Sequence, residues 1–125
     1  MNPNVQAFWD KAERAMDAAS LLINAKDAEG AVNRAYYAAF YAATAALLAE
    51  GESAKTHTGV HNRFRVRFIQ SGRLDETIGK VLPLAYHLRQ QADYDAATSF
   101  EVKAVLDLLV DIAAFIQAVR TMTTP

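Results

Sequence analysis

The sequence predicts an all-α protein, folded as an antiparallel bundle of four long helices plus one short helix. Apolar residues recur at helical spacing in four separate segments, and just over half of the 125 residues are apolar. The segment FRVRF at 64–68 alternates as a strand would, but no other segment reads as a strand that could pair with it. We therefore expect a single helical domain over residues 1–125, long enough to bury its own core.

The first helix is expected to begin just after Pro3 and to end near Ala25. Asn2 or Asn4 can cap its N-terminus, because a short amide side chain accepts a hydrogen bond from the first free backbone N–H groups. The helix is amphipathic, and its apolar stripe consists of Phe8, Ala12, Met16, Ala19 and Ile23.

The second helix is expected over roughly residues 28–50, with Asp27 as its N-cap and Gly51 as its terminator. Its residues are apolar on nearly every side. A helix of this kind belongs at the centre of a bundle, where neighbours cover all of its faces. Residues 51–59 then form a loop.

The second half of the chain is predicted to hold three helices. A short helix covers 60–70 and ends at Gly72, and a third helix runs over about 74–91. Pro83 lies inside the third helix, so we expect a kink there or a later start nearer the proline. The last helix covers roughly 97–121, with an apolar face made of Val102, Val105, Leu109, Ile112, Ile116 and Val119.

Composition excludes several kinds of site. The chain has no cysteine, which excludes disulfides, thiolate catalysis and cysteine metal ligands and favours a cytoplasmic protein. No apolar run approaches the roughly 18 residues of a membrane-spanning helix, so we expect no membrane contact. The N-terminal segment lacks the basic region and apolar stretch of a secretion signal.

Charge is unevenly distributed along the chain. Between Lys55 and Arg73 there are five basic residues and no acidic one, whereas the rest of the chain holds eight bases and fourteen acids. A basic segment on an acidic body can bind a polyanion or an acidic partner. The alternative is a solvated helix face without a ligand.

Residues 33–43, NRAYYAAFYAA, place polar and aromatic side chains on an otherwise apolar helix. Arg34, Tyr37 and Tyr41 share one side of it, because their spacing is three and four residues. Buried tyrosine and arginine side chains need hydrogen-bond partners, which the loop KTHTG (55–59) and the stretch LRQQADYD (88–95) can supply. Two interpretations stay open. The residues line a ligand site, or Arg34 is buried against a carboxylate of residues 93–95 while the tyrosines fill space.

Four segments together resemble the HEPN domain family: the helix with NRAYYAAFYAA, the loop KTHTGV, the segment SGRLD and the stretch LRQQADYD. The resemblance spans the chain from the second helix to the last, in matching order and spacing. It implies an all-α bundle that forms a homodimer. It also implies a co-encoded minimal nucleotidyltransferase as the antitoxin of a toxin–antitoxin pair.

Many members of that family are metal-independent ribonucleases with an arginine followed after four to six residues by a histidine. In this chain no arginine has a histidine at that spacing, since His57, His61 and His87 all fall elsewhere. The nearest analogue is Arg89, followed by Asp93 and Tyr94. An aspartate is a poor general acid near neutral pH unless burial raises its pKa.

A metal site is not predicted. His57 and His61 are four residues apart and on a helix could reach one ion, but Gly59 lies between them and the sequence offers no clear third ligand. We expect no cofactor either.

Two hypotheses remain. In the first, the chain is a binding module that holds RNA or nucleotide phosphate through Arg34, Tyr37, Tyr41 and Lys55, or docks a nucleotidyltransferase. In the second, it is a metal-independent endoribonuclease, with Arg89, Asp93, Tyr94 and His57 as catalytic candidates.

Overall fold

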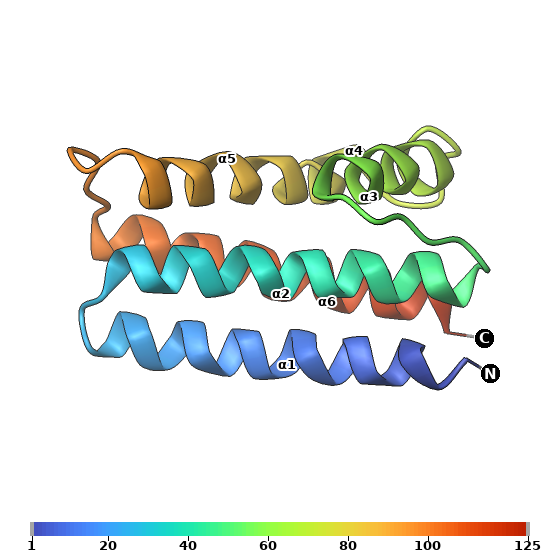
Figure 1. Cartoon of the computed structure of the whole chain (residues 1–125), viewed down its shortest axis with the longest axis horizontal. Helices are drawn as coiled ribbons and strands as arrows, with labels where there is room; N and C mark the ends of the chain where they lie inside the picture. Colours follow the sequence, from blue (N-terminus) through green and yellow to red (C-terminus); the bar gives the residue numbers. More distant parts are fainter. Residues whose placement is uncertain (1, 125) are drawn as a thin grey trace.

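A computed structural model describes residues 2–124 of the chain as an all-α bundle (Figure 1). The described residues contain no strand, and the predicted fold class is confirmed. The elements are α1 (Pro3–Asn24), α2 (Ala28–Ala49), α3 (His57–Phe64), a π-helical turn η1 (Arg65–Ile69), α4 (Glu76–Gly79), α5 (Val81–Tyr94) and α6 (Val102–Thr123).

Helix α2 is the centre of the bundle, as its apolar sequence predicted. It packs against α1, α3, α5 and α6, and α1 begins at the same end of the bundle at which α6 ends (Figure 1). The side of α2 that touches other helices is built mainly from alanine. Ala35, Ala38, Ala39, Ala42 and Ala46 are completely buried, and their small side chains let neighbouring helices approach closely.

Side-chain caps fix where the helices begin. Asn2 accepts a hydrogen bond from the backbone N–H of Asn4, so the first of the two candidate caps is the one used. Asp27 caps α2 as predicted, through the N–H of Gly30. Thr56 caps α3 in the same way and thereby makes His57 the first helical residue. The predicted loop 51–59 was therefore too long by three residues.

The short helix predicted over 60–70 is present, but its second half is a π-helical turn. The N–H of Gln70 bonds to the carbonyl of Arg65, five residues earlier. Gly51 and Gly72 both adopt positive φ, at 79° and 82°, and end the preceding segments as predicted. The π-turn was not predicted, because the apolar spacing of Val60, Phe64 and Phe68 fits an ordinary helix.

The helix predicted over 74–91 is divided at Lys80 into α4 and α5. Pro83 consequently lies in the first turn of α5, where its missing N–H removes no helical hydrogen bond. Helix α6 begins at Val102, five residues later than predicted, because Asp95 accepts a hydrogen bond from the N–H of Ala97 and organises a turn before it.

We predict that enlarging a buried alanine of α2 destabilises the fold. Ala39→Leu adds volume where the helices touch, and overpacking of this kind costs about 1–3 kcal/mol. Ala49→Leu is the matched control, since Ala49 is exposed on the same helix. Urea unfolding measures both variants, and equal midpoints would contradict close packing around α2.

Candidate functional site

The buried hydroxyl of Tyr36 joins two helices. Tyr36 lies on α2 with its side chain completely buried. Its hydroxyl oxygen is 2.7 Å from Nδ1 of His57 and 3.0 Å from Nε2 of His61, both on α3. The two histidines therefore converge, as their spacing allowed, but on a phenol rather than on a metal ion. Residues 2–124 contain no group of three or more histidine and carboxylate side chains that could hold a metal.

Burial keeps this network neutral. It raises the pKa of Tyr36 far above its ordinary value, and the neighbouring Tyr86 adds to the shift. Burial, followed by the adjacent His57, lowers the pKa of His61 to about 4. Burial and then the charge of Arg89 also lower the pKa of His57. A neutral phenol has one proton to donate, so at neutral pH Tyr36 donates to one imidazole and accepts from the other.

Aromatic packing holds the His57 ring in place. The ring stacks on Phe40 with centroids 4.3 Å apart and planes 17° from parallel. Since Nδ1 bonds to Tyr36, Nε2 is the nitrogen left for other partners, and it has none among the described side chains. His57 is therefore an oriented, neutral imidazole at the edge of the aromatic cluster, which suits a proton acceptor.

Arg89 approaches the same cluster from α5. Its guanidinium carbon lies 5.7 Å from the ring centroid of Tyr36 and 5.3 Å from that of Tyr37. Its Nε is 3.1 Å from Oδ2 of Asp93, and their side chains are 15% and 29% exposed. The contact is an ion pair without hydrogen-bond geometry, so this buried N–H has no acceptor among the described residues. The guanidinium of Arg89 is therefore held between two tyrosine rings and a carboxylate.

Arg34, Tyr37 and Tyr41 form a continuous strip along α2, as predicted. The Arg34 guanidinium lies 4.9 Å from the Tyr37 ring centroid, and the rings of Tyr37 and Tyr41 are 5.8 Å apart. All three side chains are half-buried. We call the surface made by Arg34, Tyr37, Tyr41 and Arg89 the arginine–tyrosine face.

The expected pairing of a buried Arg34 with an acid of residues 93–95 is wrong. The Arg34 side chain is only partly buried, and its Nε and Nη2 donate instead to Oδ1 of Asn33, at 3.0 and 2.9 Å. Asn33 in turn lies 3.5 Å from Oδ1 of Asp93. The carboxylate pairs with Arg89, one turn away on its own helix, so Arg34 stays available at the surface.

The remaining two candidates lie outside this cluster. Lys55 is exposed in the loop before α3, two residues from His57, and makes no ion pair with any described side chain. Tyr94 is the last residue of α5, and its side chain is 79% exposed. The structure therefore brings together Arg34, Tyr37, Tyr41, His57, Arg89 and Asp93, and leaves Tyr94 to solvent.

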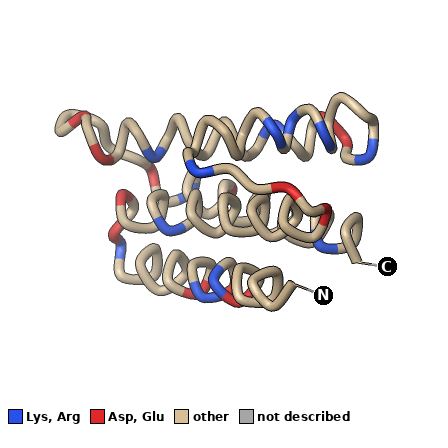
Figure 2. Tube along the Cα trace, turned by 45° about the vertical axis from the view of Figure 1, so that its right-hand side comes forward, with Lys and Arg blue, Asp and Glu red and all other residues tan. Residues whose placement is uncertain are grey.

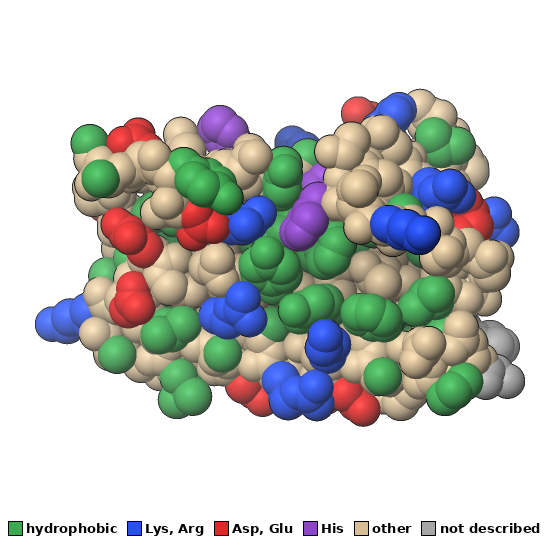
Figure 3. All heavy atoms as spheres, in the orientation of Figure 1, with side chains coloured by type: hydrophobic (Ala, Val, Ile, Leu, Met, Phe, Trp, Pro, Cys, Tyr) green, Lys and Arg blue, Asp and Glu red, His purple; other side chains and the backbone are tan. Residues whose placement is uncertain are grey.

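Two cations of α1 join the arginine–tyrosine face, and the sequence patterns did not identify them. Lys11 Nζ lies 5.0 Å from the Tyr41 ring centroid, and Lys11, Arg14, Arg34 and Tyr41 line a hollow of about 190 Å³. Figure 3 shows hydrophobic side chains across this face with basic ones among and below them, acidic ones beside the basic ones at the lower edge, and histidine above. Helical spacing placed Lys11 and Arg14 off the apolar stripe of α1, but it could not show that they border α2.

Part of the positive charge of the segment between Lys55 and Arg73 is paired with two glutamates. Arg67 pairs with both Glu50 and Glu52, at 3.2 and 2.6 Å, and Arg73 also reaches Glu50 at 2.6 Å. Arg63 lies 3.6 Å from Glu52. Figure 2 shows basic and acidic positions together at this end of the bundle. Three of the five cations therefore have carboxylate partners, which favours the alternative of a solvated helix face over a polyanion site in this segment.

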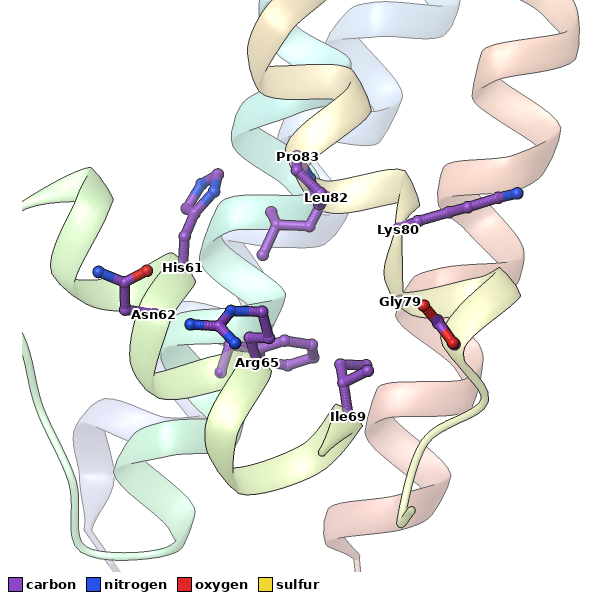
Figure 4. A pocket seen from close by; sticks show the side chains of 10 residues that line it. His61, Asn62, Arg65, Ile69, Gly79, Lys80, Leu82 and Pro83 are labelled. Atoms are coloured by element: carbon purple, nitrogen blue, oxygen red, sulfur yellow. The ribbon is translucent and has the colours of Figure 1, made fainter. Parts of the chain in front are cut away.

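A cavity of about 370 Å³ lies between α3–η1 and α4–α5 (Figure 4). His61 and Arg65 stand on one side of it, and Leu82 and Pro83 on the other. Its lining is mostly apolar. His61 connects it to the hydrogen-bonded group of Tyr36 and the two histidines.

Comparisons with known proteins agree on one family. The model of the HEPN domain matches residues 5–122. A UPF0332 protein of Thermotoga maritima is 33% identical over 116 residues, which are 92% of this chain and 88% of that protein.

No helix within residues 2–124 is long and apolar enough to cross a membrane.

Two similar proteins of Methanocaldococcus jannaschii carry a toxin name. "Putative toxin MJ0605" is 36% identical over 104 residues, covering 82% of this chain and 78% of that protein. "Putative toxin MJ0142" is 38% identical over 99 residues, covering 79% and 66%.

We predict that His61 makes stability depend on pH. Between its ordinary pKa of 6.5 and the lowered value of about 4, the unfolded chain binds a proton that the folded chain does not. The neutral, buried His61 therefore does not reduce stability above pH 6.5. Below pH 6.5 the free energy of unfolding decreases as the pH is lowered toward 4. The lowered pKa of His57 acts in the same direction.

Urea unfolding near pH 5 and near pH 7 measures this dependence. His61→Asn, which cannot titrate, should weaken it, whereas His87→Asn changes an exposed histidine and should leave it intact. If stability depends on pH equally in the two variants, His61 is not the cause of the loss of stability at low pH.

Proposed function

This chain belongs to the HEPN domain family, and we propose that it is a toxin-like member that binds RNA or nucleotide phosphate on the arginine–tyrosine face. The observation that carries the proposal is the presence of two guanidinium groups, those of Arg34 and Arg89, against the ring of Tyr37 on one surface. A phosphate oxygen is a strong acceptor for a guanidinium. Arg34, which donates to Asn33, has no acidic partner among the described side chains.

The surroundings of the two arginines favour an anionic ligand. The Tyr37 ring lies against both guanidinium groups, at 4.9 Å from Arg34 and 5.3 Å from Arg89. Lys55 lies in the loop that leads to His57 and adds a positive charge near the start of α3. Asp93 opposes binding, but it already neutralises part of the charge of Arg89 and holds that side chain in position.

The partners implied by the family belong to the same proposal. We expect a co-encoded nucleotidyltransferase as antitoxin, and the toxin names of two relatives support a toxin-like role for this chain. We also expect a homodimer. The buried alanines of α2 are already covered within one chain, so we expect the interface on another helix. Helix α6 instead exposes Val102, Leu106 and Val110 at spacings of four residues.

We predict salt-dependent RNA binding that needs the cations of the arginine–tyrosine face. Arg34→Ala and Lys55→Ala should each weaken binding, because each removes a positive charge near the ligand phosphates. For a single strand the slope of log affinity against log salt should shrink by about 0.7 for each phosphate that is no longer neutralised. Fluorescence anisotropy with a labelled oligonucleotide at low and moderate salt measures both quantities.

Lys103→Ala is the matched control, since Lys103 is exposed on α6 and pairs with Asp107. Binding that is absent at low salt, for the chain alone and with any co-encoded nucleotidyltransferase, would overturn the proposal.

A second candidate function, metal-independent RNA cleavage, is supported by the proximity of His57 to Arg89. The charge of Arg89 contributes to the lowered pKa of His57, and both side chains flank the rings of Tyr36 and Tyr37. His57 would accept the proton of a ribose 2′-hydroxyl as that oxygen attacks the adjacent phosphorus. Arg89 would stabilise the phosphorane while the bond to the 5′-oxygen breaks, and the leaving 5′-oxygen would take up a proton from the His57 imidazolium or from water. The products are a cyclic phosphate and a 5′-hydroxyl.

For this candidate we predict RNA cleavage in the presence of EDTA that is lost in His57→Ala and in Arg89→Ala. Tyr94→Phe should cleave normally, because Tyr94 is exposed at the end of α5. Denaturing gels with end-group analysis detect the cyclic phosphate. If the wild type binds RNA but does not cleave it, the proposal of RNA cleavage is overturned and the proposal of RNA binding stands.

A further inference from the structure

We propose that the arginine–tyrosine face, extended by Phe8, Lys11 and Arg14 of α1, binds single-stranded rather than double-stranded RNA. The inference rests on the proposed function, because it assumes that RNA is the ligand. It adds the form of the substrate and the path of the strand, which runs from the start of α3 across α2 to α1.

A row of aromatic rings marks the path. The centroids of His57 and Tyr37 are 5.9 Å apart, those of Tyr37 and Tyr41 are 5.8 Å apart, and those of Tyr41 and Phe8 are 6.1 Å apart. The rings belong to three helices that are distant in sequence. Tyr37, Tyr41 and Phe8 are partly exposed. An unstacked base can contact each ring when the long side chain of Lys11 or Arg34 that lies over it turns toward the strand's phosphates. Stacking on aromatic side chains is a usual way to hold a single strand without reading its sequence.

Cations accompany these rings. Lys11 Nζ lies 5.0 Å from the Tyr41 centroid and 5.5 Å from that of Phe8, and Arg34 covers Tyr37 at 4.9 Å. The hollow of about 190 Å³ between α1 and α2 is lined by Lys11, Arg14 and Arg34 and by no acidic residue. Charged side chains can follow a strand's phosphates while the rings hold its bases.

Three acidic residues of α1 lie near these cations in sequence, and none forms an ion pair with them among the described residues. Glu13 lies beside Arg14 in sequence, but its carboxylate accepts a hydrogen bond from Arg120 of α6 at 2.8 Å. Asp10 accepts one from the neutral amide of Gln6 at 2.9 Å, and Asp17 is exposed on the same helix. Neither Lys11 nor Arg14 forms an ion pair with a side chain in residues 2–124. Their charge is therefore directed to solvent beside the rings.

Base stacking is the feature that distinguishes the two forms of RNA. In a duplex the base faces are covered by neighbouring pairs, and a protein meets mainly phosphates and 2′-hydroxyl groups. A duplex could use Lys11 and Arg14 but could not place bases against half-buried rings. An unpaired strand can use both sets of groups, and it should therefore bind more tightly.

The experiment compares a labelled oligouridine with a hairpin duplex of equal length by fluorescence anisotropy. We expect the wild type to prefer the single strand. The double variant Lys11→Ala/Arg14→Ala should weaken that binding at least tenfold and reduce its salt slope by about 1.4, because two phosphates are no longer neutralised. Lys103→Ala is the control for removal of an exposed lysine elsewhere, and circular dichroism checks that each variant is folded.

Tyr41 separates stacking from charge. Tyr41→Ala should weaken single-strand binding roughly tenfold with little change in salt slope. Tyr41→Phe keeps the ring and should bind nearly as the wild type does. The same two variants should leave any residual duplex binding unchanged.

The outcomes distinguish this inference from the function on which it rests. RNA binding that is unaffected by Lys11→Ala/Arg14→Ala, or equal for single strand and duplex, overturns the strand path and leaves RNA binding intact. Complete absence of RNA binding in the wild type overturns both. Loss of binding in Tyr41→Ala together with Tyr41→Phe would place the role in the hydroxyl group and would also overturn base stacking.

Discussion

The hydroxyl of Tyr36 is the constraint on which the site depends. It is the polar end of a completely buried side chain, and burial would be costly if it had no hydrogen-bond partner. His57 and His61 of α3 are its partners. The position of α3 against α2 is therefore set by a polar interaction as well as by apolar packing, and the orientation of both imidazoles follows from it.

This constraint explains why α2 differs on its two sides. The alanine side admits neighbouring helices closely, and this packing needs no polar group. The other side carries Tyr36, Tyr37 and Tyr41, and it must either pair its polar atoms within the chain or expose them. The hydroxyl of Tyr36 is hydrogen-bonded to the histidines of α3. Tyr37 and Tyr41 remain half-buried, with the cations Arg34 and Lys11 over their rings. One helix thus supplies the core on one side and the candidate ligand surface on the other.

The fold was predictable from sequence, because apolar spacing and capping residues act locally. Asp27 and Gly51 marked the ends of α2 correctly. The pairing of charges was not predictable, because it depends on which helices meet. The run from Lys55 to Arg73 suited a polyanion by its composition, yet three of its arginines pair with Glu50 and Glu52. The sequence did not identify Lys11 and Arg14 as site residues, because only the packing of α1 against α2 brings them beside Arg34 and Tyr41.

The same reasoning applies to the missing arginine–histidine spacing. That spacing puts both side chains on one helix, where they can reach one phosphate. In this chain Arg89 comes from α5, and its neighbour at the next turn is Asp93, which pairs with it. The imidazole comes instead from the first turn of α3, where Thr56 caps the helix and Tyr36 holds Nδ1 of His57. A spacing rule along one helix cannot detect a pair formed between two helices. Without the family signature, this chain still has a guanidinium and an oriented imidazole, from two different helices, beside the same aromatic rings.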